Sequence, residues 1–450
     1  AYALNLGVRR GVAEIQVASD LVGMALDVPA PLGKAAAAPL AVRFDNQLTS
    51  EAAAAGGAPL QDQLTLELGD VARLAYVRAL DGEQARVLRG AVAVGLPAGQ
   101  ALALPARGVT ANAQLGQLDV DAWSALLDQH QAAPDGAGAQ AQASVSDYLP
   151  DSLALRASAI AFKGRSLNDV VAGVSHSASV WRANVTAREL DGYVEYRQAE
   201  GAAQQDMLHA RLSRLALPQS DESQLNALLD AQQPARLPAL DIVVQDFELR
   251  DRSLGRLEIE ARNRATPDGQ REWRLARFNL ATPEAVFASS GSWALVGGAG
   301  GAPQRRTRMD FALDIRDSGQ LLARFGMGGV LRRGKGRIAG QVGWLGTPLS
   351  PDYRSMTGQM HVDVESGQFL KAEPGLAKLL GVLSLQSLPR RFALDFRDVF
   401  SEGFAFDFVR GDVHVDQGVA TTNNLQMKGV NAAVLMEGSA DIERETQDLH

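Results

Sequence analysis

Cysteine is absent from this chain of 450 residues, which excludes a disulfide scaffold, thiolate metal sites and cysteine nucleophiles. Lysine is scarce, with six among the 44 basic residues, and aromatic residues make up only 6%. No run of 18 apolar residues occurs, so no segment has the pattern of a membrane-spanning helix. The net charge of -8 argues against a broad nucleic-acid-binding surface.

The chain instead alternates apolar and polar residues from end to end. Examples are the apolar positions of 64–68, 247–249 and 309–315, and the stretches between them are rich in Gly, Pro, Asn and Asp. This period of two residues is typical of strands with one apolar face, joined by turns. Hydrophobic residues at 46% and charged residues at 21% are ordinary for a folded protein. The pattern therefore predicts a mainly β, mostly antiparallel fold.

Helical patterns are few and short. We expect helices near 119–128, 221–230, 320–331 and 373–388, the first of them capped by Asp119. The chain starts inside a strand-like pattern and stops inside a motif, so we interpret it as an internal fragment. Targeting and anchoring segments would then lie outside it.

Residues with catalytic chemistry do not form a recognisable site. The six histidines have no metal-binding spacing, and alternation places His361 and His414 on the polar side of their strands. The segment 289–292 lacks the spacing of a serine nucleophile elbow. Carboxylates gather in the sequence at Asp395, Asp398, Glu402 and Asp407, but Asp395 alternates with apolar neighbours as a solvated residue. We predict no catalytic residue, no metal and no cofactor.

The last third of the chain carries the most specific motifs. They are WLGTPLS (344–350), PRRFALDFRDVFSEGFAFD (389–407) and GDVHVDQGVATTNNLQMKG (411–429). Over residues 340–449 this pattern resembles the C-terminal signature of the AsmA-like proteins, most of all the YhdP-like branch of Gram-negative bacteria. Residues 1–335 match it only in style, as alternating strands.

The resemblance implies a long, curved, mostly antiparallel sheet that forms a taco-like hydrophobic groove. It divides the chain into a repeating β-groove segment, 1–335, and a C-terminal region, 336–450, in which the helix near 373–388 caps the groove. The implied function is to carry phospholipid acyl chains across the periplasm between inner and outer membrane, with an inner-membrane anchor outside this chain. Phospholipids and the two membranes are the expected partners, alongside an unidentified envelope protein and no nucleic acid.

The candidate groove residues are apolar side chains that alternation places on one face. They are Phe311, Leu313, Ile315, Met360, Val362, Val364, Leu394, Phe396, Phe404, Phe406 and Phe408. Burying an acyl chain against such a face gains about 0.8 kcal/mol per CH₂ group. The candidate headgroup contacts are the basic residues Arg332, Arg333, Lys335 and Arg337. The alternative is a non-catalytic β-sandwich or β-solenoid module of a surface protein, in which the same faces form closed cores.

Overall fold

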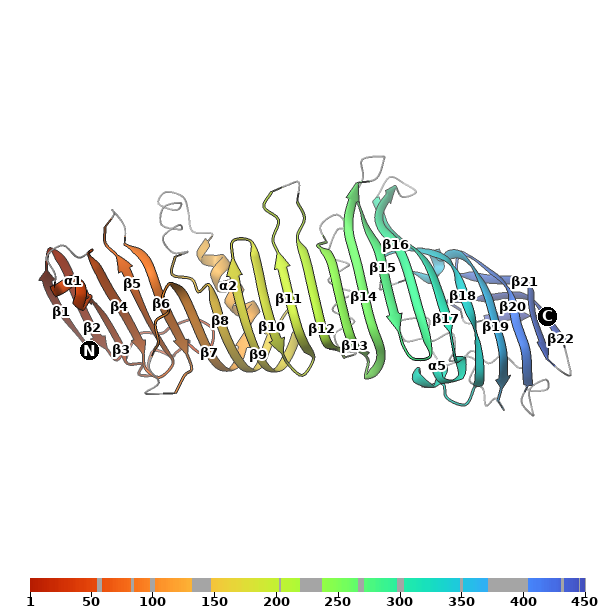
Figure 1. Ribbon diagram of the computed structural model, residues 1–450, viewed down its shortest axis with the longest axis horizontal. Helices are drawn as coiled ribbons and strands as arrows, with labels where there is room; N and C mark the ends of the chain where they lie inside the picture. Colours follow the sequence, from red (N-terminus) through yellow and green to blue (C-terminus); the bar gives the residue numbers. More distant parts are fainter. Residues whose placement is uncertain are drawn as a thin grey trace. The chain divides into compact units, whose positions relative to one another are not determined.

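The computed structural model describes most of the chain (Figure 1). The described residues are 1–54, 59–81, 85–97, 102–131, 147–201, 204–218, 237–265, 271–297, 303–348, 351–370, 404–429, 433–444 and 446–449. They divide into two compact units, residues 1–195 (unit 1) and 196–450 (unit 2).

In unit 1, strands that follow one another in the chain are also neighbours in the sheet. Its strands are β1 (Tyr2–Arg9), β2 (Val12–Ser19), β3 (Val42–Leu48), β4 (Gln61–Leu68), β5 (Ala72–Ala79), β6 (Arg86–Val94), β7 (Gly108–Asp119), β8 (Ser152–Phe162), β9 (Arg165–Ser177) and β10 (Val180–Thr186). Strand β11 (Leu190–Arg197) contains the division between the units. Pairing is antiparallel from β1 to β6 and from β8 to β10, but β6–β7 and β7–β8 are parallel.

Unit 2 follows the same rule. Its strands are β12 (Met207–Leu217), β13 (Ala239–Leu249), β14 (Arg252–Ala265), β15 (Arg271–Ala281), β16 (Ala285–Gly297), β17 (Pro303–Ile315), β18 (Leu331–Leu345), β19 (Thr357–Phe369), β20 (Phe404–Asp416), β21 (Val419–Gly429), β22 (Ala433–Asp441) and β23 (Thr446–Leu449). Among the pairings of these described strands, β12–β13 alone is parallel, and each later strand pairs antiparallel with the next. The mainly β, mostly antiparallel fold predicted from the sequence is confirmed.

The described helices are α1 (Ser50–Ala54), α2 (Val120–Gln131) and α5 (Ser318–Arg324), with a single 3₁₀ turn, η2 (Tyr353–Ser355). Helix α2 begins as expected: the Asp119 carboxylate accepts a hydrogen bond of 2.9 Å from the backbone N–H of Ala122. Helix α5 is shorter than the predicted 320–331. Gly326, directly after the C-cap residue Phe325, adopts a φ of +80° and ends the helix, and β18 then starts at Leu331.

Two expected helices, near 221–230 and 373–388, lie outside the described residues. The boundary expected at 335/336 falls inside β18, a strand that is paired on both sides.

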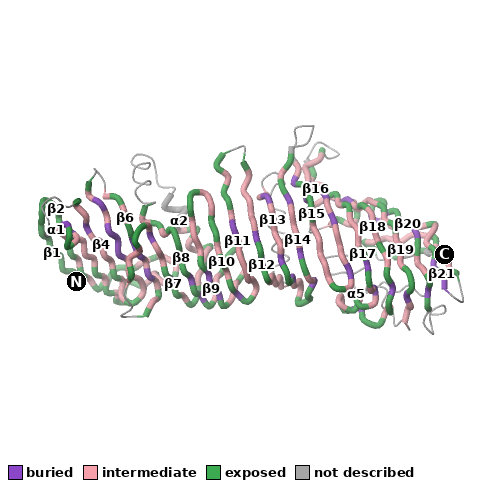
Figure 2. The backbone as a smooth tube through the Cα atoms, in the orientation of Figure 1, coloured by how far each residue is buried: buried purple, intermediate pink, exposed green. Residues whose placement is uncertain are grey.

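In each unit, the strand register separates the two faces of the sheet. In unit 1 a buried cluster of small and aliphatic side chains forms on one face of β7–β9, for example Leu155, Ala157 and Val170. At the opposite extreme, every residue of β1 is exposed, as Figure 2 shows in green. In unit 2 buried clusters lie along β14–β18 and around Phe406 and Met427.

A polar cluster interrupts the apolar face of unit 1. Asp62 and Arg78 are directly opposite each other on β4 and β5, on the same face as Leu64 and Leu66. The Arg78 Nε donates to an Asp62 carboxylate oxygen over 2.9 Å, and the Asp62 side chain is only 3% exposed. Arg78 also donates to the hydroxyl of Tyr148 over 3.1 Å. The Asp62 hydrogen bond raises the pKa of Arg78 further, so the Arg78 guanidinium stays charged inside an apolar face.

Candidate functional site

A strip of apolar side chains runs across four neighbouring strands of unit 2. Residues directly opposite each other in a sheet share a face, so the register identifies its members. Phe287 pairs with Leu313, Leu313 with Ile338, and Ile338 with Val362. Two residues further along these strands, Phe311 pairs with Gly340 and Gly340 with Met360. We call Phe287, Phe311, Leu313, Ile338, Met360 and Val362 the apolar strip.

The side chains of the apolar strip pack on one another without being sealed. The Phe287 and Phe311 rings stack with centroids 6.3 Å apart, and Phe278 meets Phe287 edge-on at 6.2 Å. All six strip residues are neither fully buried nor fully exposed. Each therefore keeps apolar surface that a ligand can cover.

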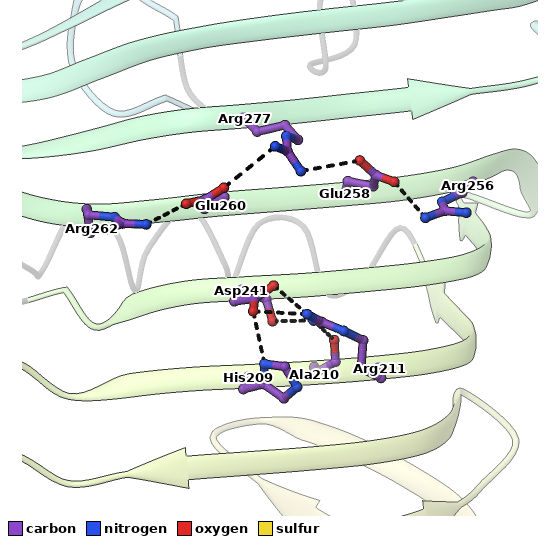
Figure 3. Close-up of polar contacts among 9 residues, drawn as sticks. All are labelled: His209, Ala210, Arg211, Asp241, Arg256, Glu258, Glu260, Arg262 and Arg277. Atoms are coloured by element: carbon purple, nitrogen blue, oxygen red, sulfur yellow. Dashed lines mark hydrogen bonds and ion pairs between the residues drawn. The ribbon is translucent and has the colours of Figure 1, made fainter.

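The alternate residues of the same strands form a polar face on the other side of the sheet. Asp310, Asp314, Arg337, His361 and Asp363 all lie there. The register pairs Arg337 with both Asp314 and Asp363, Asp310 with Gln341, and His361 with Asp412. On strands β12–β15 the same face carries ion pairs that link neighbouring strands, drawn in Figure 3. Apolar and polar surfaces are thus separated strand by strand.

A row of tryptophans closes one end of the apolar strip. Trp273 pairs with Trp293, which pairs with Thr307, and Thr307 pairs with Trp344, all on the apolar side. Each indole N–H donates to a loop carbonyl: Trp273 to Pro238 over 3.2 Å, Trp293 to Gly346 over 3.0 Å, and Trp344 to Thr347 over 2.8 Å. Trp293 is completely buried. The row is therefore a satisfied, packed border, with no free indole left for a ligand.

Helix α5 covers the other end of the strip. Leu321 of this helix packs with Ala285 and Ile315, and all three are buried. An ion pair fixes the helix, because Arg324 Nε and one terminal nitrogen donate to the Glu284 carboxylate over 2.9 and 2.7 Å. These hydrogen bonds lower the pKa of Glu284 to about 2. The open part of the apolar face is thus bounded at both strand ends.

At two glycines on the apolar side the backbone of the neighbouring strand comes too close for any side chain. A Cβ on Gly340 would lie 2.2 Å from the Gln359 carbonyl oxygen, and one on Gly291 2.2 Å from that of Arg308. Both distances are far below any real contact, so only glycine fits. Glycine kinks of this kind introduce curvature into sheets. The missing side chains of both glycines would point to the apolar side of the sheet.

Apart from Phe408, the predicted groove residues divide into three groups. Phe311, Leu313, Met360, Val362 and Val364 share the apolar face, as expected from alternation. Ile315 is on that face but buried beside α5, and Phe406 is 4% exposed in a cluster with Met427 and Phe369. Leu394, Phe396 and the side chain of Phe404 lie outside the described residues.

Phe408 is on the polar face, which corrects the expectation that it points the same way as Phe406. It pairs with Glu365, and the Arg410 guanidinium lies 5.2 Å from its ring centroid. The β20–β21 pairing shifts register between Phe406 and Phe408. This irregularity breaks the alternation on which the prediction depended.

The predicted headgroup contacts Arg332, Arg333, Lys335 and Arg337 are all exposed. Lys335 and Arg337 lie on the polar face, and Arg337 faces Asp314 at 3.4 Å. Sequence reasoning missed the bordering Trp273 and Trp293. The sequence pattern that could have identified them is one tryptophan near the end of each of two consecutive strands, at a position that alternation assigns to the apolar face.

The histidine and carboxylate candidates are surface groups where they are described. His361 Nδ1 lies 2.7 Å from Asp412, and Asn424 also donates to that carboxylate over 2.8 Å; these contacts lower the pKa of Asp412. Asp407 is exposed, and Asp395, Asp398 and Glu402 lie outside the described residues. Among the described residues, no three ligand-type side chains gather closely enough to hold a metal ion. In the same ranges, no helix is both long and apolar enough to cross a bilayer.

Comparison with known proteins identifies relatives. The family described as YhdP protein matches residues 3–450, far beyond the 340–449 of the sequence resemblance, so the first 335 residues share more than style with it. The intermembrane phospholipid transporter YhdP of Escherichia coli (strain K12) is 30% identical over 126 residues. That match covers 28% of this chain and 10% of the relative. No solved structure matches.

Proposed function

Because the chain belongs to the YhdP protein family, we propose that it is a segment of a lipid-transfer protein whose apolar strip holds phospholipid acyl chains. The name of the Escherichia coli relative, an intermembrane phospholipid transporter, supports phospholipid as the cargo. The observation that carries the proposal is the apolar strip itself, half-exposed and continuous across β16–β19.

Physical chemistry explains how such a surface works without specific contacts. Each acyl CH₂ that leaves water gains about 0.8 kcal/mol, whichever strip side chain it touches. Neighbouring positions along the strip are nearly equivalent in energy, so a chain can slide between them. Sliding breaks no covalent bond, so the proposed role requires neither a catalytic residue nor a cofactor.

The compartment follows from the cargo. A carrier between inner and outer membrane works in the periplasm, and we place this segment there, with its inner-membrane anchor in a part of the protein outside residues 1–450. The two membranes are the proposed donor and acceptor. The groove would be the apolar side of the sheet, where the two close-packed glycines lie.

The alternative, a closed β-sandwich, needs a second sheet over the strip. All described strands of unit 2 pair into one sheet, and the strip residues stay partly exposed. Both observations favour an open, ligand-binding face.

A pair of adjacent substitutions tests the proposal. Phe311→Glu places a charge on the apolar strip, whereas Ala312→Glu places it one residue away on the polar face. A charge on the strip imposes a desolvation cost of several kcal/mol on a passing acyl chain. We expect native mass spectrometry to find phospholipid on the wild-type protein and on A312E, and little on F311E. Folded wild-type protein that never carries lipid, or lipid retained equally by F311E, would contradict the proposal.

A further inference from the structure

The polar face of unit 2 contains a hollow that the lipid role does not use. It has a volume of about 380 Å³ and opens over β17, β18 and β19. Its lining includes Arg306, Arg308, Asp310, Gln341, Thr357 and Gln359. Gly343 forms part of its floor, because a residue without a side chain leaves space between Arg308 and Thr357, its partners on either side.

This hollow is on the opposite side of the sheet from the apolar strip. Arg308 and Asp310 alternate with Met309 and Phe311 along β17, and Gln341 pairs with Asp310. Gln359 pairs with Gln341 in turn. A lipid chain on the strip therefore cannot reach it through the sheet.

The two arginines of the hollow differ from other arginines of the polar face. Arg277 lies within 3.9 Å of Glu258 and Glu260, Arg337 pairs with Asp314, and Arg410 with Asp363. Among the described residues, Arg306 and Arg308 have no ion pair and no side-chain hydrogen bond. The Arg306 Nε is even buried without an acceptor, which is costly for a charged donor.

We infer that this hollow binds the oxyanion of a phosphate or phosphate ester. Two guanidinium groups present planar pairs of donors that match phosphate oxygens. The amides of Gln341 and Gln359 and the hydroxyl of Thr357 add neutral donors around the same space. The chain as a whole carries a net charge of -8, which repels anions, so binding would depend on the local charge of these two arginines.

The Asp310 carboxylate allows a second, independent test of anion binding in this hollow. It lines the same hollow and repels an anion, so it lowers the affinity without forming part of the donor set. Removing its charge should strengthen binding, whereas removing the arginines should weaken it.

Calorimetric titration with inorganic phosphate tests the site on the whole chain. We expect saturable binding by the wild-type protein and a loss of roughly tenfold or more in R306Q/R308Q, because charge-assisted hydrogen bonds are lost. R337Q, which removes an arginine already paired on the same face, should change the affinity less than twofold. D310N should bind phosphate more tightly. Circular dichroism establishes that each variant keeps its sheet.

Sedimentation with phosphatidylglycerol vesicles then distinguishes two sources of the phosphate group. Vesicle binding that needs Arg306 and Arg308 and is displaced by inorganic phosphate identifies a lipid headgroup. Phosphate binding without vesicle binding identifies a soluble phosphate ester, and both results support the site. No saturable phosphate binding by the wild type, an equal loss in R337Q, or unchanged affinity in D310N would overturn it. None of these results depends on acyl-chain binding at the apolar strip.

Discussion

At the scale of single residues, Gly340 is where the sheet of unit 2 tolerates no side chain at all. An added Cβ would lie 2.2 Å from the Gln359 carbonyl oxygen and 2.7 Å from the Met360 Cα, and neither backbone atom can move cheaply. We expect Gly340→Ala to lower the free energy of unfolding by about 2–3 kcal/mol, in the range of overpacked cores. Urea denaturation measures this change.

Gly173 in β9 provides the matched control. It is also a strand glycine, but nothing lies within 4 Å of its would-be Cβ. Gly173→Ala should be neutral or slightly stabilising, because alanine restricts the unfolded chain. Equal stability of G340A and G173A would mean that β18 and β19 separate easily at Gly340, which would contradict the close approach of their backbones there.

At the scale of elements, α5 depends on one carboxylate outside the helix. The Arg324 hydrogen bonds lower the pKa of Glu284 from 4.5 to about 2, so the charged form is stabilised in the folded state. A lowered folded-state pKa gives stability that is present above pH about 4.5 and lost as the pH falls toward about 2. With allowance for solvent screening, this contribution is about 1–2 kcal/mol.

Glu284→Gln tests whether the charge of Glu284 stabilises the position of α5. We expect E284Q to be less stable than the wild type at neutral pH and the difference to shrink as the pH approaches 2. Parallel urea titrations at several pH values measure it. A difference that stays constant with pH would show that Glu284 acts through packing and not through its charge.

At the scale of the whole molecule, contacts between neighbouring strands dominate both units. In such an architecture the stability is approximately a sum of local contributions, so a destabilising substitution should affect only the strands near it. Arg78→Met leaves the buried Asp62 carboxylate without its partner. We expect the free energy of unfolding to fall by about 3–5 kcal/mol, as is typical when one partner of a buried ion pair is removed. Hydrogen exchange should accelerate in β3–β6 and stay unchanged in β16–β19.

Arg337→Met is the comparison, since Arg337 and Asp314 are 61% and 55% exposed and such surface pairs contribute about 0–1 kcal/mol. Exchange in β16–β19 should barely change in this variant. Faster exchange throughout both units in R78M would contradict local stability and indicate that the chain unfolds as one cooperative body.

The sequence by itself determined the class of fold, because a period of two residues leaves only one face apolar wherever pairing is regular. It also identified the family, and it placed Phe311, Leu313, Met360 and Val362 on one face. Alternation gave the wrong face for Phe408, because the register of β20 shifts beside it. The predicted helix at 320–331 was too long, because Gly326 adopts a positive φ and ends α5.

Only the tertiary structure decided which apolar residues remain open. Ile315 and Phe311 are equivalent in the sequence pattern, yet Ile315 is buried beside α5 while Phe311 stays half-exposed. The pairing of β17 with β18 also decided that Arg308 faces Gly343, and within the described ranges Arg308 has no ion pair. Burial and charge neutralisation depend on neighbours from other strands, and a period along one strand contains no information about them.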